Sequence, residues 1–153
     1  MIAIVQRVKS GRVTVAGQVV GEIGVGMVVL AAVHADDTSA DVGWMAAKIA
    51  TLRIFPSEDG EKYFDRDVKA VGGGVLLISN FTVAAETQSG RRPSLSPAAS
   101  PEAARPIFEE LLRVTRAQGV TVATGEFGAD MLVDIANDGP VTFLLDSRPS
   151  RKK

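Results

Sequence analysis

The chain has 153 residues, of which 46% are hydrophobic and 23% charged, and its formal net charge is −1 at pH 7. This near-neutral balance argues against a protein that binds nucleic acid without sequence preference, because such binding depends on neutralising many phosphates. The chain contains no cysteine, which excludes disulfides, thiol nucleophiles and cysteine-ligated metals. We expect a single domain over 1–147, followed by a basic tail at 148–153.

The first third of the chain alternates in the manner of β-strands. Gly11, Gly17, Gly24 and Gly26 fall at the breaks, which favours an antiparallel meander of hairpins. The candidate strands are 2–8, 12–17, 18–24 and 26–33. The opening residues carry no basic leader, and no apolar run reaches the length of a membrane span. We therefore expect a cytoplasmic protein with no membrane partner.

Two segments have the pattern of amphipathic helices. The first is 36–55, capped by Thr38 or Ser39. Its apolar stripe is Val42, Met45, Ala46, Ile49 and Leu52. The second is 101–118, with Ser100 as its cap. Pro106 costs this helix a backbone hydrogen bond unless the regular helix starts only near it.

The remaining segments are a loop and further strands. The loop, "QSGRRPSLSPAASP" (88–101), is long enough to be functional. The segment 53–64 indicates a short strand and a turn, and the later strands are expected at 72–87, 120–128, 129–138 and 139–147. The order predicts an α/β or α+β domain whose sheets are covered by two helices. The last strands lack polar alternation, which predicts cover on both faces or burial between subunits.

The side chains offer little familiar chemistry. His34 is the only histidine, and a histidine at a strand end is more often structural than catalytic. No spacing indicates a zinc site, so we expect no metal. Asp36, Asp37 and Asp41 are explained by the dipole of the first helix. Nothing selects a pair of carboxylates for glycoside hydrolysis.

Two stretches fit these ordinary interpretations less well. "SNFTVAAET" (79–87) places polar residues within an apolar strand, although an exposed strand face would account for them. "NDGPVT" (137–142) breaks an apolar stretch with a Gly-Pro pair, although an ordinary turn would account for it.

Together, the two stretches resemble the paired signatures of the D-aminoacyl-tRNA deacylase family, a Ser-Gln-Phe-Thr-Leu motif and an Asn-x-Gly-Pro-Val-Thr motif. They stand here as "SNFTVAA" (79–85) and "NDGPVTFLL" (137–145). The resemblance continues through 4–8, 20–30, 48–55, 90–96 and 124–131, and so covers nearly the whole chain. Asn80 stands where the family usually has glutamine, and Val83 where it has leucine. Asparagine is about 1.5 Å shorter in reach.

The resemblance implies a mixed α+β fold with stacked, barrel-like sheets and two helices on one side. It also implies a homodimer with its two active sites at the subunit interface. In this family the Gly-Pro bond is cis, and the pair projects into the active site of the other subunit.

The implied reaction is hydrolysis of the ester that joins a D-amino acid to the acceptor end of tRNA; glycine mischarged on tRNA-Ala is also expected as a substrate. Backbone amides at Phe81 and Thr82, flanked by Ser79 and Asn80, would stabilise the oxyanion. The substrate's ribose hydroxyl can assist the water, so no cofactor is expected. Thr82 as a nucleophile is the alternative, but the sequence shows no base to activate it.

Further roles follow from the same resemblance. Gly139 and Pro140 would form a wall that rejects L-amino acids. Arg7 would hold that loop, with a surface arginine as the alternative. Met131 would line the amino-acid pocket, with core packing as the alternative. Arg91 and Arg92 would contact tRNA phosphates.

Three other functions remain open from the sequence. The chain could be a same-fold editing enzyme with L-amino acid specificity, or a non-catalytic dimer that binds aminoacyl-tRNA. An unrelated small-molecule esterase is disfavoured because a Ser-His pair is missing.

Overall fold

The computed structural model describes residues 1–148, so all of the expected tail except Arg148 lies outside it. The elements in chain order are β1 (Ile2–Val15), β2 (Gln18–Ile23), β3 (Gly26–Ala32), α1 (Ser39–Thr51), β4 (Gly74–Ser79), a short 3₁₀ helix (Phe81–Ala84), α2 (Pro101–Ala117), β5 (Thr121–Thr124) and β6 (Leu132–Asp146). The alternation of strands and helices matches the predicted order.

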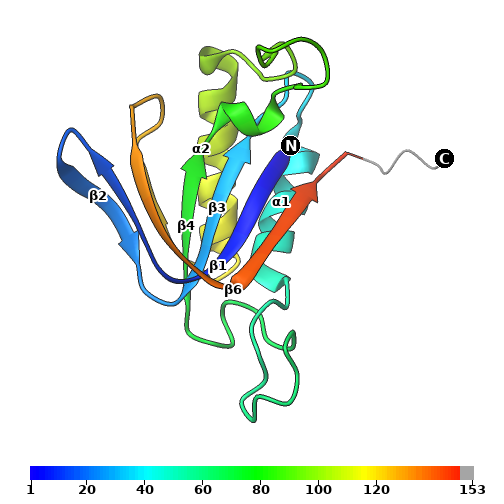
Figure 1. Ribbon diagram of the computed structural model, residues 1–153. Helices are drawn as coiled ribbons and strands as arrows, with labels where there is room; N and C mark the ends of the chain where they lie inside the picture. The colour runs from blue at the N-terminus through cyan, green and yellow to red at the C-terminus, as the bar shows by residue number, and fades with distance from the viewer. Residues whose placement is uncertain (149–153) are drawn as a thin grey trace.

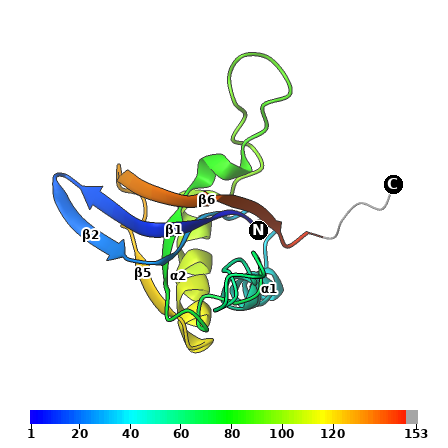
Figure 2. The same ribbon diagram turned by 60° about the horizontal axis from the view of Figure 1, so that its bottom comes forward.

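The sheet is organised around β1. Its first half pairs with β3 and its second half with β2, while β6 runs antiparallel along its other edge. β4 joins β3 in parallel, and β5 joins β4 in parallel. β5 also approaches β2 so closely that a Cβ on Gly21 would lie 2.2 Å from the Thr124 carbonyl oxygen. The sheet is therefore nearly closed, with α1 and α2 on one side of it (Figures 1 and 2), which confirms the predicted barrel-like α+β fold.

The helices begin where the sequence indicates. Thr38 and Asp41 form a capping box at the start of α1, and the Ser100 hydroxyl accepts a bond from the Ala103 amide at the start of α2. α1 ends at Thr51, earlier than expected, so Leu52 is its C-cap. α2 begins at Pro101, as predicted, and it contains Pro106 within its regular part, so the helix accepts the lost backbone hydrogen bond there. Within the described residues, no helix is both long and apolar enough to cross a membrane.

Three predicted boundaries in the strands are wrong. Gly11 lies inside the continuous strand β1, where a Cβ would approach Val28 Cγ2 to 2.7 Å; it provides packing space and makes no turn. The strand predicted at 72–87 ends at Ser79, and a 3₁₀ helix follows. The strand expected within 53–64 is reduced to a single bridge between Phe55 and Arg66.

The "NDGPVT" segment is a bulge within one strand, so both the predicted break and the ordinary turn are wrong. β6 continues through it from Leu132 to Asp146. From Gln6 to Val8, β1 advances two residues, while the paired positions in β6 run from Thr142 to Asn137, which is five residues. The extra residues leave the regular ladder, so the segment between Asn137 and Thr142 bends away from β1.

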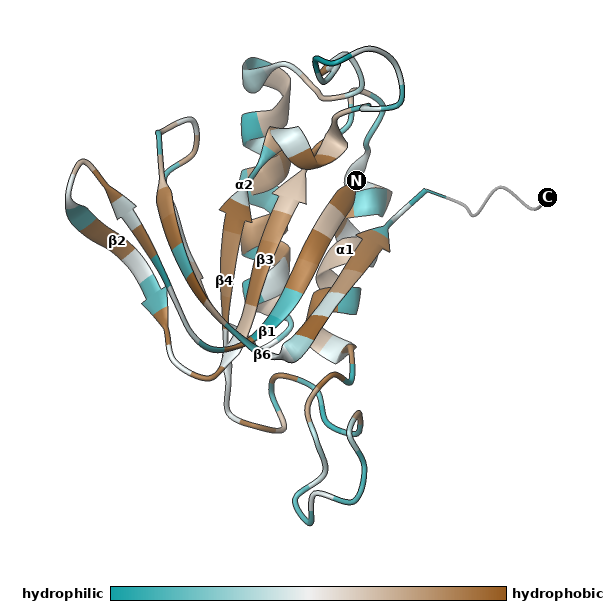
Figure 3. Cartoon of the chain, viewed as in Figure 1, coloured by the Kyte–Doolittle hydropathy of each residue, from teal (hydrophilic) through white to brown (hydrophobic). Residues whose placement is uncertain are grey.

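The apolar residues form two clusters, one on each side of the sheet. The larger lies between the sheet and the helices and includes Met45, Ile49 and Leu111. The smaller fills the inside of the curled sheet and includes Val13, Leu76 and Ile78. In Figure 3 the central strands are largely hydrophobic and the loops largely hydrophilic. The Ser147 hydroxyl after β6 donates to Asp41 of α1 at 2.6 Å and lowers the pKa of that carboxyl to about 2.

Candidate active site

A cavity of about 650 Å³ opens at the carboxyl end of β4. Its walls come from β3, β4, the 3₁₀ helix, the loop before α2, the start of α2 and the segment 127–133, and they are mostly apolar. Four of the predicted site residues line it: Ser79, Asn80, Phe81 and Met131. Its size and lining are typical of a site for a small organic group.

The 3₁₀ helix places two backbone donors at the edge of this cavity. The Asn80 amide still bonds to the sheet, at 2.8 Å from the Ala31 carbonyl oxygen, and the Val83 amide bonds back to the Asn80 carbonyl at 3.2 Å. The amides of Phe81 and Thr82 lie between these and open the helix. The first N–H groups of a helix have no acceptor within it. Two adjacent donors are therefore available to a developing oxyanion.

The Thr82 side chain is engaged with its neighbour. Its hydroxyl donates to the Asn80 side-chain oxygen at 2.5 Å, and Thr82 is exposed and outside the cavity lining. An amide oxygen is not a base that could activate a hydroxyl. This contact favours a positioning role for Thr82.

His34 holds one wall of the cavity. The ring is buried, and its Nδ1 donates to the Pro97 carbonyl at 3.2 Å, while His34 forms a backbone bridge with Ala98. Ala98 and Leu95 line the cavity. The sequence prediction of a structural histidine agrees with this tether, although the sequence did not indicate what it holds.

The Gly139–Pro140 segment is fixed to β1 by amide side chains. The peptide bond between the two residues is cis, and Gly139 has φ +127°. The Asn137 side-chain amide donates to the Arg7 carbonyl at 2.9 Å and to the Val141 carbonyl at 3.1 Å. The Gln6 amide donates to the Thr142 hydroxyl at 3.1 Å. The bulge is thus bound on both of its flanks.

Arg7 lies beneath the same bulge. It is only 3% exposed, so the alternative of a surface arginine is wrong. Its Nη1 donates to the Ile54 carbonyl at 2.7 Å, and its Nη2 to the Tyr63 hydroxyl at 3.0 Å. Its Nε lies 3.2 Å from the Asp138 carboxylate, as an ion pair without an aligned hydrogen bond. The guanidinium therefore joins the bulge to two neighbouring segments.

One chain does not bring the two signatures together. Ser79 lies at the level of Ala3, whereas the bulge lies between Gln6 and Val8. Four residues of strand span about 13 Å, and β6 and β4 are three strand spacings apart, about 14 Å. In Figure 1 the 3₁₀ helix lies at the top and the bend of β6 at the bottom.

Arg91 and Arg92 lie in an exposed loop, and neither residue lines the cavity. A bridge between Glu86 and Ser94 closes this loop. In Figure 2 it rises from the side of the sheet opposite the helices. The cavity opens near the base of the same loop, since Leu95 and Ala98 line its wall.

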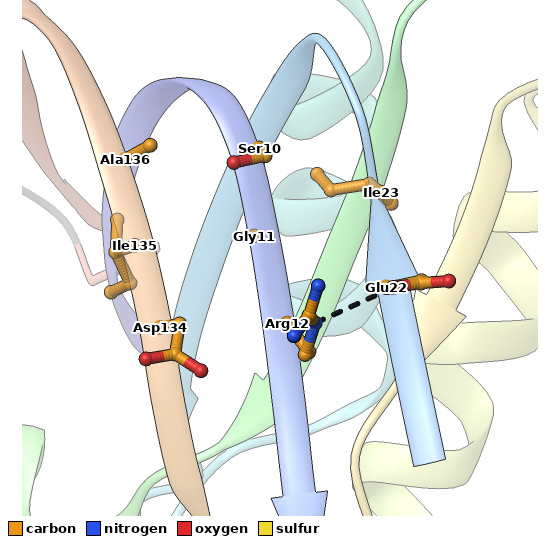
Figure 4. Close-up of a pocket in the computed structure, with 8 residues that line it drawn as sticks. All are labelled: Ser10, Gly11, Arg12, Glu22, Ile23, Asp134, Ile135 and Ala136. Carbon is orange, nitrogen blue, oxygen red and sulfur yellow. Dashed lines mark ion pairs between the residues drawn. The ribbon is translucent and has the colours of Figure 1, made fainter. Parts of the chain in front are cut away.

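A second hollow, of about 450 Å³, lies among β1, β2 and β6 (Figure 4). Arg12 crosses it between Glu22, with which it forms an ion pair at 3.5 Å, and Asp134, its partner in the β6 ladder. The lining carries one cation and two carboxylates, and Arg12 is already paired with Glu22, so we assign this hollow no chemistry.

Comparison with known proteins agrees with this geometry. The profile of a family described as D-Tyr-tRNA(Tyr) deacylase matches residues 4–146. A D-aminoacyl-tRNA deacylase from Carboxydothermus hydrogenoformans is 50% identical over 95% of this chain and 99% of its own length. One from Alteromonas mediterranea is 47% identical over 94% of this chain and 97% of its own.

Two solved structures have the same fold. The c-Myc DNA Unwinding Element Binding Protein superposes with a TM-score of 0.92 and 35% identity, over 97% of this chain and 100% of the other. A probable eukaryotic D-amino acid tRNA deacylase superposes with a TM-score of 0.80 and 15% identity, over 94% and 97%. The chain belongs to the D-Tyr-tRNA(Tyr) deacylase family, whose members hydrolyse the ester of D-aminoacyl-tRNA.

Proposed function

We propose that this D-aminoacyl-tRNA deacylase works as a homodimer in which the cavity of one subunit is completed by Gly139–Pro140 of the partner subunit. We propose that it also hydrolyses glycine mischarged on tRNA-Ala. The observation that carries this proposal is the pair of amides at Phe81 and Thr82, which have no backbone acceptor within residues 1–148, beside a cavity lined by Ser79, Asn80 and Met131.

Catalysis rests on backbone donors. Water attacks the ester carbonyl, the carbonyl oxygen becomes an oxyanion, and the bond to the ribose oxygen then breaks. The Phe81 and Thr82 amides stabilise the oxyanion. The neighbouring ribose hydroxyl of the substrate receives the proton from the water and returns one to the leaving oxygen. The chain supplies position and charge stabilisation, and Asn80, bonded to the Thr82 hydroxyl, fixes the first turn of the 3₁₀ helix.

The exposed apolar side chains support the dimer. Leu144 is 64% exposed and Phe81 59% exposed, although both are large and apolar. In the sheet, Leu144 pairs with Ile4, and Ile4 pairs with Leu30. Ile4 and Leu30 are only half-buried. The helices cover the other face of these strands. An apolar sheet face without helical cover is typical of an interface. A two-fold axis perpendicular to the strands would reverse their direction and bring the partner subunit's bulge to the level of the cavity.

Chiral selection follows from the position of the partner subunit's Gly139–Pro140 segment, which forms a backbone wall on one side of the substrate's α-carbon. Exchanging L for D swaps the hydrogen and the side chain at the α-carbon, so a backbone wall on one side rejects every L side chain regardless of its chemistry. Glycine has no side chain to collide and passes. Carbonyls of the bulge would accept the substrate's α-ammonium group. Arg91 and Arg92, on the loop beside the cavity, would contact phosphates of the acceptor end.

The test is hydrolysis of D-Tyr-tRNA, L-Tyr-tRNA and Gly-tRNA-Ala at the same enzyme concentration. We expect loss of the D-tyrosyl and glycyl esters and survival of the L ester. Hydrolysis of the L ester would contradict the chiral wall and favour an editing enzyme of altered specificity. Survival of all three would leave a dimer that binds aminoacyl-tRNA, and Asn80→Gln would then be the first variant to examine.

A further inference from the structure

Tyr63 touches the bulge from outside the two signatures. It lies in the loop between α1 and β4, at the bottom of Figure 1. Its hydroxyl accepts the 3.0 Å bond from Arg7 Nη2. A Cβ on Gly139 would lie 2.9 Å from the same hydroxyl oxygen. The hydroxyl therefore lies directly against the backbone of Gly139.

The tyrosine ring contacts two neighbouring side chains, those of Arg7 and Phe64. The Arg7 guanidinium carbon is 4.7 Å from its centroid, within the range of cation–π contacts. The Phe64 ring lies 4.8 Å away and contacts in turn Phe143 of β6, at 5.7 Å. Arg7 is buried and bonded to the Ile54 carbonyl. A half-exposed tyrosine thus contacts β1 through Arg7 and, by way of Phe64, reaches Phe143 of β6.

We propose that Tyr63 is a positioning residue for chiral selection, whose hydroxyl keeps Gly139 from moving back when an L side chain presses on it. This inference rests on the proposed function, because it assumes that Gly139–Pro140 forms the wall of a site. A wall excludes an L side chain only as well as it resists displacement, and a displacement of about 1 Å in a positioned site is enough to change a rate a hundredfold. The hydroxyl opposes that shift with a bonded contact to a buried cation.

The test is Tyr63→Phe, which removes only the hydroxyl and keeps both ring contacts. We expect the ratio of D-Tyr-tRNA to L-Tyr-tRNA hydrolysis to fall by about tenfold, as one hydrogen bond to a charged group would allow. The rate on the L ester should itself rise above that of the wild type. A merely structural effect would lower both rates together and would not produce this gain.

The matched control is Glu61→Gln, which alters an exposed side chain of the same loop and leaves the Tyr63 hydroxyl and both ring contacts in place. We expect it to keep the wild-type ratio. An unchanged ratio in Tyr63→Phe, a parallel loss of both rates, or an equal change in the control would overturn the role of the hydroxyl. A wild-type enzyme that does not discriminate D from L would instead contradict the proposed function itself, so the two failures are distinguishable.

Discussion

At the scale of single residues, the bond between Thr82 and Asn80 separates two mechanisms. In the proposed mechanism the Thr82 hydroxyl only positions Asn80. Thr82→Val should then lower kcat/KM for D-Tyr-tRNA by roughly three- to tenfold, the value of one ordinary hydrogen bond. A nucleophile would lose on the order of a thousandfold or more. Thr82→Ser, which keeps the hydroxyl, should have a kcat/KM close to that of the wild type. A thousandfold loss in Thr82→Val together with full activity in Thr82→Ser would instead establish a catalytic hydroxyl.

Residue identities could be predicted only where a local signal existed. Ser79, Asn80, Phe81 and Met131 were expected at one cavity, and the structure places them there. Tyr63 was not expected at all. Its contact with Arg7 joins positions 56 apart in the chain, and such a contact leaves no trace in spacing or periodicity. A tyrosine in a polar loop is an ordinary surface residue until the fold is known.

At the scale of elements, close backbone approach explains the glycines of the sheet. A Cβ on Gly26 would lie 1.9 Å from the Gly74 carbonyl oxygen, so β3 and β4 could not keep their pairing. Gly26→Ala should lower the free energy of unfolding by about 3 kcal/mol or more. Gly43→Ala on α1 is the matched control, since a Cβ there meets nothing within 4 Å. Gly43→Ala should raise the free energy of unfolding by up to about 1 kcal/mol.

Urea unfolding of both variants at one protein concentration would measure these changes, because the stability of a dimer depends on concentration. A Gly26→Ala variant as stable as the wild type would show that the two strands can separate without loss, and would contradict the tight pairing seen at Gly74.

Element boundaries were predictable where capping residues mark them. Ser100 and Pro101 fix the start of α2 within the chain, and the structure agrees. The 3₁₀ helix was missed because Phe81, Thr82 and Val83 all favour strands. The Asn80 amide still bonds to Ala31 of β3, and the chain then turns, with the Val83 amide bonding back to the Asn80 carbonyl. The bulge in β6 was missed for a similar reason, since its register is set by β1.

At the scale of the whole molecule, the separation of the two signatures within one chain leads to the strongest test. Phe81→Pro removes one backbone donor at the first position of the 3₁₀ helix, where proline is tolerated. It should reduce D-Tyr-tRNA hydrolysis by a hundredfold or more, on the order of the loss known for one oxyanion donor. Gly139→Trp should abolish activity, because a Cβ there would lie 2.7 Å from Val141 Cγ2 and 2.9 Å from the Tyr63 hydroxyl and so displace the bulge from the partner subunit's cavity. Phe81→Ala keeps the N–H and serves as the control.

The Phe81→Pro homodimer and the Gly139→Trp homodimer should each be inactive, yet refolding the two variants together should restore activity. Half of the resulting dimers are mixed, and each mixed dimer has one site with an intact amide from one subunit and an intact Gly139 from the other. The recovered rate should therefore approach about a quarter of the wild-type value, as two-fold symmetry requires. A site contained within a single chain would recover nothing, because every chain in the mixture carries one defect. Recovery would thus establish that the two signatures, far apart in each subunit, meet only across the dimer.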